Sequence, residues 1–168
     1  MVAGLVLGLA VCQAVAARAQ SSNDSTQFHA WLSAGVGGGN SDRGGFAGRA
    51  AASIAISPLV FLTLEGTSVG NIDGTDDSIN LMAGVRSPDP NGFFFLSAGL
   101  ANTSCGSGCP NQTGIAADGG VHIGGRYAGV ALVAFAVRAP GRSSASGVVL
   151  SLDVGLFGGR RAATTNTK

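Results

Sequence analysis

The chain has 168 residues, of which 11% are charged and 45% are apolar, and its net charge is +1. A soluble domain usually carries about 25% charged residues, so this chain has too little charge to cover a normal aqueous surface. The near-zero net charge gives no reason to expect nucleic acid or an acidic partner. The length is that of a single domain.

Residues 1–19 are predicted to be a signal peptide. An apolar stretch ends in Ala17-Arg18-Ala19, which is similar to an A-x-A cleavage site. Two alternatives are a retained N-terminal helix and a lipoprotein processed at Cys12, although Val11 is a poor residue for that processing. No later segment has the roughly 18 consecutive apolar residues of a transmembrane helix.

Alternation of apolar and polar residues with period two dominates from residue 28 to residue 157 and predicts a β-barrel domain of eight strands. A short N-terminal segment, 20–27, precedes it, and a disordered tail, 158–168, follows it. Each strand is near the roughly 9–11 residues that a tilted strand needs to cross a bilayer. The predicted strands are 28–37, 45–56, 60–68, 78–86, 93–102, 113–123, 127–138 and 147–157.

The connections between these strands alternate in character. The first, third, fifth and seventh are predicted to be long and polar, whereas the second ("SPL") and the sixth ("GGR") are short. Outer-membrane barrels pair long extracellular loops with short periplasmic turns. The third connection holds Asp73, Asp76 and Asp77. Their spacing departs from that of an EF-hand calcium loop, so we expect an exposed acidic loop.

The two faces of the predicted strands differ. Along 60–68, the uncharged face carries Val60, Leu62 and Leu64, and the other face carries Thr63 and Glu65. A water-soluble sandwich would need many more charges, with lysines on its edge strands. We therefore expect the apolar face to meet lipid and the polar face to line a lumen. Because lipid leaves no partner for exposed backbone groups, the sheet must close.

Three charges of each sign are predicted to point into this lumen. They are Arg49, Arg86, Arg138, Glu65, Asp118 and Asp153. The interior of an eight-stranded barrel is just wide enough for side chains, so these charges must pair with one another. If Ile56 pairs with Val60, Arg49 and Glu65 become diagonal neighbours, and we predict an ion pair between them.

The strand 127–138 is apolar on both faces, so its alternation does not distinguish inside from outside. We assign Arg138 inward and Tyr127, Val133 and Phe135 outward. Trp31 is expected to point inward. Aromatic residues near the strand ends are expected to form girdles at the two membrane interfaces. The predicted girdle residues are Phe28, Phe46, Phe94, Tyr127 and Phe135.

Cys105 and Cys109 lie in the fifth connection, in the sequence "SCGSGC". Export permits a disulfide, and a short Gly-Ser loop can close one, so we predict that these cysteines are bonded. A metal site is less favoured because no histidine lies nearby and two thiols do not fill a tetrahedral site. No metal and no cofactor are expected.

These features resemble the small eight-stranded outer-membrane barrels of Gram-negative bacteria, the OmpA/OmpX-like family. The resemblance covers residues about 27–158 and includes the last strand, "GVVLSLDVGLFGG", which looks like the family's signal for the barrel-assembly machinery, although the usual terminal aromatic residue is absent. It implies an all-β, antiparallel, up-and-down transmembrane barrel. We expect a monomer in the outer membrane, in contact with lipid and lipopolysaccharide and with no nucleic acid partner.

The predicted role is structural or adhesion-like, with a filled lumen, surface loops and no enzymatic activity. One alternative is a membrane-embedded enzyme that modifies lipid A, which would need a His, a Ser and an acid near the lipid-facing surface. Asp118 and His122 share a face, but we assign that face to the lumen. The other alternative is a secreted soluble barrel with a ligand in its lumen. A porin-like channel is disfavoured because eight strands leave no continuous bore.

Overall fold

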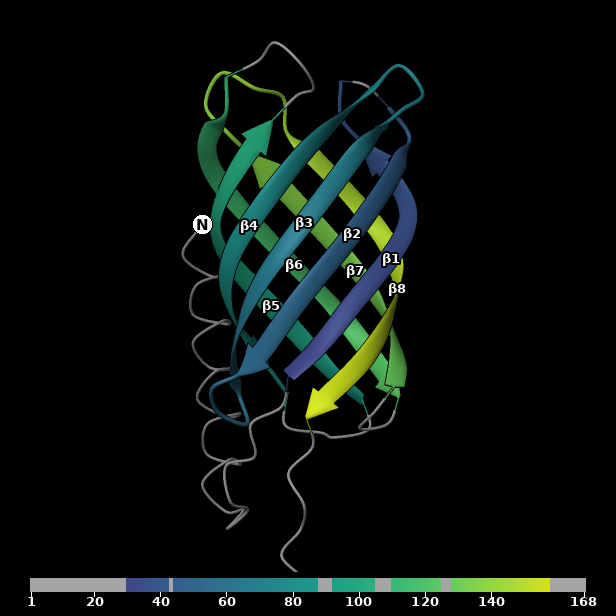
Figure 1. The fold of residues 1–168 in the computed structure, drawn as a ribbon, viewed down its shortest axis with the longest axis vertical. Coiled ribbons are helices and arrows are strands. Elements are labelled where there is room, and N and C mark those ends of the chain that lie inside the picture. The colour runs from purple at the N-terminus through teal and green to yellow at the C-terminus, as the bar shows by residue number, and fades with distance from the viewer. Residues whose placement is uncertain (1–29, 43, 88–91, 105–109, 125–127, 158–168) are drawn as a thin grey trace, which may run out of the picture.

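The computed structural model describes residues 30–42, 44–87, 92–104, 110–124 and 128–157, and these residues form one closed antiparallel barrel of eight strands (Figure 1). Each strand pairs with its neighbours in the chain, and the first pairs with the last. The predicted all-β barrel is confirmed. The strands are β1 (Ala30–Asn40), β2 (Phe46–Ala55), β3 (Val60–Asn71), β4 (Gly74–Arg86), β5 (Gly92–Ser104), β6 (Gln112–Gly124), β7 (Ala128–Arg138) and β8 (Ala145–Phe157).

Several predicted features lie outside the described residues. They are the signal peptide over 1–19, the segment 20–27, the tail 158–168, the Cys105–Cys109 disulfide, and the girdle residues Phe28 and Tyr127.

The two ends of the barrel differ. At one end, which we call the turn end, lie residues 56–59, the start of β1, the end of β8, and the strand ends Arg86, Gly92, Gly124 and Ala128. At the other end, which we call the loop end, lie residues 41–42, 44–45, 72–73, 110–111 and 139–144. The strands tilt strongly between the two ends, as a closed eight-stranded sheet requires (Figure 1).

The third connection is much shorter than predicted. β3 and β4 remain paired as far as Asn71 and Gly74, so only Ile72 and Asp73 form the turn. Asn71 Oδ1 accepts a hydrogen bond from the Asp73 backbone at 2.8 Å, as asparagine often does in a turn. The prediction of a long loop here is wrong because backbone pairing does not require apolar side chains, and the polar residues simply extend the hairpin.

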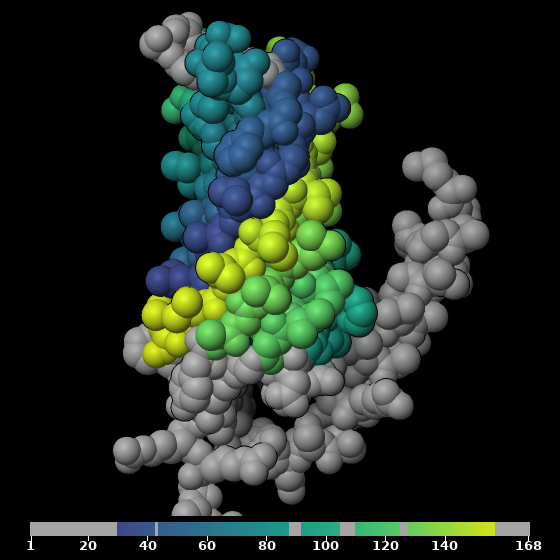
Figure 2. Space-filling view, turned by 90° about the vertical axis from the view of Figure 1, so that its right-hand side faces the viewer, coloured from purple at the N-terminus to yellow at the C-terminus, as the bar shows by residue number. Residues whose placement is uncertain are grey.

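The outside of the barrel is an apolar belt. Large aliphatic and aromatic side chains point outward on every strand; Leu81, Phe94 and Leu152, for example, are 61%, 69% and 66% exposed. Figure 2 views this outer face over β1, β7 and β8, which lie side by side as tilted bands. A soluble monomer rarely exposes a contiguous apolar patch of more than a few hundred Å². The belt is therefore a surface for lipid.

The girdle prediction holds in part. Phe46 and Phe94 are 60% and 69% exposed and lie at the starts of β2 and β5. Trp31 points inward, as predicted, and its ring centroid lies 5.7 Å from that of Phe61.

The described residues contain no helix long and apolar enough to cross a membrane.

The register assigned to strand 127–138 is wrong. Val133 and Phe135 are 0% and 4% exposed and point into the barrel, whereas Arg138 is exposed on the outer face opposite Ile115. Because β7 is apolar on both faces, its own alternation carries no information. Pairing with β8 decides it, since Val149 opposes Val133 and both side chains are fully buried.

Replacing Leu81 with arginine tests the membrane-facing belt. Leu81 pairs with Leu64 and Leu100, which also point outward. A charge at mid-belt costs about 2–4 kcal/mol in a bilayer. We expect Leu81→Arg to lower the yield of folded protein in vesicles, measured by heat-modifiable gel mobility. Ile72→Arg is the matched control, because Ile72 is fully exposed in the turn beyond the belt. Equal yields for the two variants would contradict the assignment.

Candidate functional site in the lumen and at its mouth

The centre of the lumen holds one arginine between two carboxylates. Arg49 projects from β2, and its Nε lies 2.5 Å from Glu65 Oε2 on the adjacent β3. Its Nη2 lies 2.9 Å from Asp118 Oδ2, which belongs to β6 across the lumen. The side chains are no more than 5% exposed. The guanidinium therefore links two sides of the barrel wall through its interior.

Neutral side chains complete this central cluster. Asn80 Nδ2 donates to the second oxygen of Glu65 at 3.1 Å, and Ser97 Oγ donates to Asp118 Oδ1. The backbone register follows the prediction, since Ala51 is opposite Glu65 and Arg49 is opposite Thr67. Each of the three charged groups has an oppositely charged partner, and each carboxylate also accepts a hydrogen bond from a neutral side chain. Buried charges are tolerated when they are paired and hydrogen-bonded in this way.

A second cluster lies around Asp153 on β8. His122 Nδ1 on β6 is 2.6 Å from Asp153 Oδ2, and Ser33 Oγ on β1 donates to Asp153 Oδ1 at 2.5 Å. The imidazole stacks on Phe93, with ring centroids 4.6 Å apart. Residues Ser33, His122 and Asp153 are 6–7% exposed. The sequence placed His122 in the lumen but gave no signal for its pairing with Asp153.

Aromatic side chains fill the turn end. Trp31, Phe61, Phe93 and Phe95 contact one another, with centroid separations of 5.7–6.3 Å. A Cβ at Gly84 would collide with the Phe61 ring, so a glycine is needed there. These rings close the lumen at this end.

Arg86 lies within this aromatic cluster and not among the acids. Its guanidinium carbon is 5.4 Å from the Trp31 ring centroid and 5.3 Å from that of Phe93, and its Nε donates to the Pro58 carbonyl at 3.1 Å. Within the described part of the chain, it has no ion-pair partner. The predicted balance of three arginines against three acids is therefore wrong. Arg86 interacts with aromatic rings, which attract cations, and Arg138 points out of the barrel.

The lumen leaves little free space between these groups. Among the described residues, the cavity bounded by Arg49, Asp118, Asp153 and the turn-end rings has a volume of about 10 Å³. That is about the space of one water molecule. On the loop-end side of the central cluster, the interior is apolar and includes the buried side chains of Val69, Phe135 and Val149. The described side chains leave no continuous bore.

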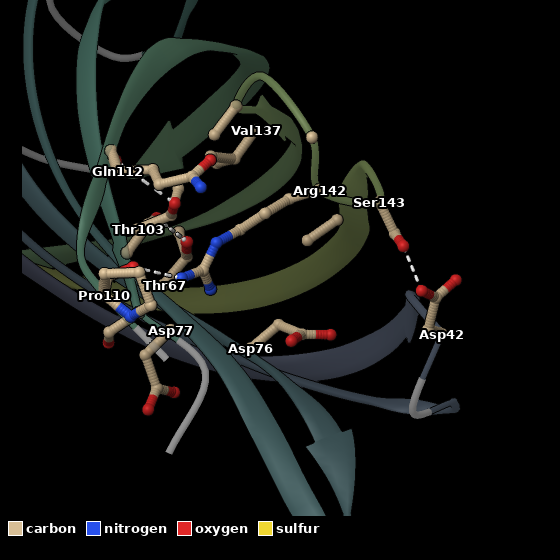
Figure 3. A pocket seen from close by; sticks show the side chains of 15 residues that line it. Asp42, Thr67, Asp76, Asp77, Thr103, Pro110, Gln112, Val137, Arg142 and Ser143 are labelled. Carbon is tan, nitrogen blue, oxygen red and sulfur yellow. Dashed lines mark hydrogen bonds between the residues drawn. The ribbon is translucent and has the colours of Figure 1, made fainter. Parts of the chain in front are cut away.

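An open vestibule of about 440 Å³ lies at the loop end (Figure 3). Thr67 and Ser78, whose hydroxyls are 2.6 Å apart, belong to its lining, as do Asp76, Gln112 and Arg142. The described residues contain no group of three His, Cys, Asp or Glu side chains placed to hold a metal ion. The vestibule is thus a polar recess that ends above a packed interior.

Two contacts tie the loops around this vestibule together. Arg142 Nη2 donates to the Pro110 carbonyl, and Ser143 Oγ donates to Asp42 Oδ2. Figure 3 shows the Arg142 side chain extending across the recess toward Pro110. Gly141, at φ +68°, supplies a left-handed backbone conformation directly before Arg142. Sequence reasoning missed Arg142, because nothing local indicates which loops meet at the mouth of a barrel.

Neither a family model nor a curated protein matches the chain in sequence. Solved structures do match its fold. The N-terminal β-barrel domain of Pseudomonas aeruginosa OprF superposes with a TM-score of 0.58 at 14% identity, over 77% of this chain and 99% of that chain. Neisserial surface protein A matches with a TM-score of 0.52 at 14% identity, over 76% and 96%.

Ail, the attachment invasion locus protein of Yersinia pestis, matches with a TM-score of 0.53 at 9% identity, over 79% of this chain and 100% of that chain. At such identities the likeness concerns the fold alone. Together with the outward apolar belt and the filled interior, it leads to one conclusion. The chain is an eight-stranded antiparallel transmembrane β-barrel with the fold of the small outer-membrane barrel proteins.

Proposed function

We propose that this protein resides in the outer membrane of a Gram-negative bacterium and presents its loop end at the cell surface, in a structural or adhesion-like role. The observation that carries the proposal is the division of the molecule into an apolar belt, a packed lumen and one polar, open end. A barrel of this kind forms no large passage, so the loop end is the part available to partners.

The orientation rests on the asymmetry of the ends. Outer-membrane barrels place short turns in the periplasm and longer loops outside. The loop end here carries the vestibule and the ionic residues Asp42, Asp73 and Arg142. The turn end carries both ends of the strand sequence, and Ser57 Oγ accepts backbone hydrogen bonds in its first turn. These features favour a periplasmic turn end.

The adhesion-like role is supported at the level of fold and surface. One structural neighbour is named a surface protein and another an attachment invasion locus protein. Because one fold hosts many functions, those names alone carry little weight. The independent support is the pair of contacts, Arg142–Pro110 and Ser143–Asp42, which join described residues of three connections at the loop end. An ordered surface loses less entropy when it binds a partner.

We further propose that the cluster of Arg49, Glu65 and Asp118 holds the lumen closed. Arg49 contacts two strands on opposite sides of the interior, so its loss would leave two buried carboxylates facing each other. Asp153 belongs to the second cluster, in which it contacts His122. Arg86 and Arg138 are excluded from this role by their positions.

The geometry gives little support to an enzyme of lipid A. Of the described residues, His122 is the only histidine. Its side chain points into the lumen, away from lipid. Ser33 donates to Asp153 and not to the imidazole, so the histidine does not activate it as a nucleophile. Ser33 and His122 thus act as the hydrogen-bonding partners that allow the Asp153 carboxylate to be buried.

Removing Arg49 alone tests the central cluster. Breaking one side of a buried ion pair costs about 3–5 kcal/mol. We expect Arg49→Met to lower the free energy of unfolding by that amount, measured by urea titration in vesicles. The triple variant Arg49→Met, Glu65→Gln, Asp118→Asn should recover most of the loss, because no charge then remains unpaired. A triple variant as unstable as the single one would show that the charges do not act as a unit.

Solute flux tests whether the lumen is closed. Because the aromatic end and the central cluster leave only about 10 Å³ free in the described interior, we expect vesicles containing the protein to swell in a small sugar no faster than empty vesicles. A porin incorporated in parallel provides the positive control. Sugar entry at a rate near that of the porin would contradict a filled lumen and favour a channel.

Cell attachment tests the adhesion-like role. We expect cells that express the protein to bind epithelial monolayers better than cells with empty vector. The double variant Arg142→Ala, Ser143→Ala should lose part of this gain, because it releases the loop ties. An epitope inserted between Ile72 and Asp73 should be stained on intact cells, whereas one at Pro58 should need permeabilisation. Attachment equal to the vector control, with Ile72 epitope staining present, would refute adhesion but not the location.

A further inference from the structure

Arg138 lies on the outer surface, at the edge of the apolar belt nearest the loop end. It is the last residue of β7, its Cα partner on β6 is Ile115, and Ile115 is 64% exposed. The described basic residues are Arg49, Arg86, Arg138 and Arg142. Arg49 and Arg86 face the interior, and Arg142 reaches over the vestibule. Among the four described arginines, Arg138 is therefore the one whose side chain lies on the outer face of the barrel wall.

Polar side chains continue from Arg138 around the barrel. Thr113 lies two residues before Ile115 on the same face of β6, which makes it a diagonal neighbour of Arg138. Asn102 on β5 is the Cα partner of Thr113, and all three side chains are exposed. On the turn-end side of this row, the outward residues Leu100, Ile115 and Leu132 belong to the apolar belt. The row thus marks the boundary between hydrocarbon and head groups.

Within the described strands, no acid on the outer face of β6 or β8 lies beside Arg138. In the described strands, Asp77 on β4 is the acid that lies on the outward face near the loop end. Its carboxylate accepts a hydrogen bond from Thr75 at 3.1 Å. β4 and β7 are not neighbours in the barrel. The guanidinium can rest its aliphatic stem on Ile115 and extend its head toward the interface, as long basic side chains do at membrane boundaries.

We propose that Arg138 binds the phosphate of an anionic lipid head group in the leaflet at the loop end, with Thr113 and Asn102 supplying further hydrogen bonds. This proposal rests on the membrane placement given above. A guanidinium matches a phosphate with two parallel hydrogen bonds. The belt below it holds the acyl chains of the same lipid, so a lipid is bound in preference to free phosphate.

Lipid enrichment in nanodiscs tests the proposal. The barrel is placed in phosphatidylcholine nanodiscs containing phosphatidylglycerol, and the lipids retained on the released protein are counted by native mass spectrometry. A basic residue near a membrane surface changes affinity for anionic lipid by about fivefold. We expect Arg138→Gln to lose about that factor in phosphatidylglycerol enrichment. Arg138→Lys should keep part of it, and Arg142→Gln, in the loop beyond the belt, should match wild type.

Each other outcome would overturn the inference. Equal enrichment in Arg138→Gln and wild type would show that Arg138 does not bind the head group. An equal loss in Arg142→Gln would indicate general charge attraction and no defined site. Loss of the enrichment at a low concentration of added inorganic phosphate would contradict the preference of the site for a lipid over free phosphate. Failure of the wild-type barrel to insert into any nanodisc would refute the membrane placement itself, whereas insertion without selectivity would refute only the site.

Discussion

The closure of the sheet between β1 and β8 is the constraint on which the rest of the structure depends. In a bilayer, every unpaired backbone amide or carbonyl costs several kcal/mol, so an edge strand is not tolerated. The pairing of Ala30–Asn40 with residues of β8 removes both edges at once. Closure in turn gives each strand one face toward lipid and one toward the lumen, and this division accounts for the low charge and the strong alternation of the sequence.

A closed sheet of eight strands also creates a narrow interior, and its contents must fit and be electrically satisfied. The central cluster answers this demand by placing Arg49 between Glu65 and Asp118, while His122 and Ser33 satisfy Asp153. Apolar groups occupy the remaining volume, including fully buried Val133 and Val149. Small inward residues leave room for the long side chains. The interior is therefore a mixed polar and apolar core, and not a channel lining.

Local patterns predicted the parts of this arrangement that depend on neighbouring strands. The short "SPL" connection and clear alternation fix the register of β2 and β3, and that register brings Arg49 beside Glu65. The contact of His122 with Asp153 could not be predicted in the same way, since β7 lies between their strands and the contact depends on barrel curvature. The orientation of Arg138 could not be predicted because β7 offers no polar face, so its pairing with the neighbouring strands β6 and β8 sets its orientation.

The separation of a packed lumen from a polar mouth has a consequence for function. Because the interior is anchored by contacts across the barrel, changes in the loop end need not disturb the wall. The vestibule is bounded below by Thr67 and Ser78, which are bonded to each other, and above by the loop ties of Arg142 and Ser143. The loop end therefore presents a preformed recess on top of a packed interior. This division is the physical basis of the proposed recognition at the loop end, and it gives no support to transport through the barrel.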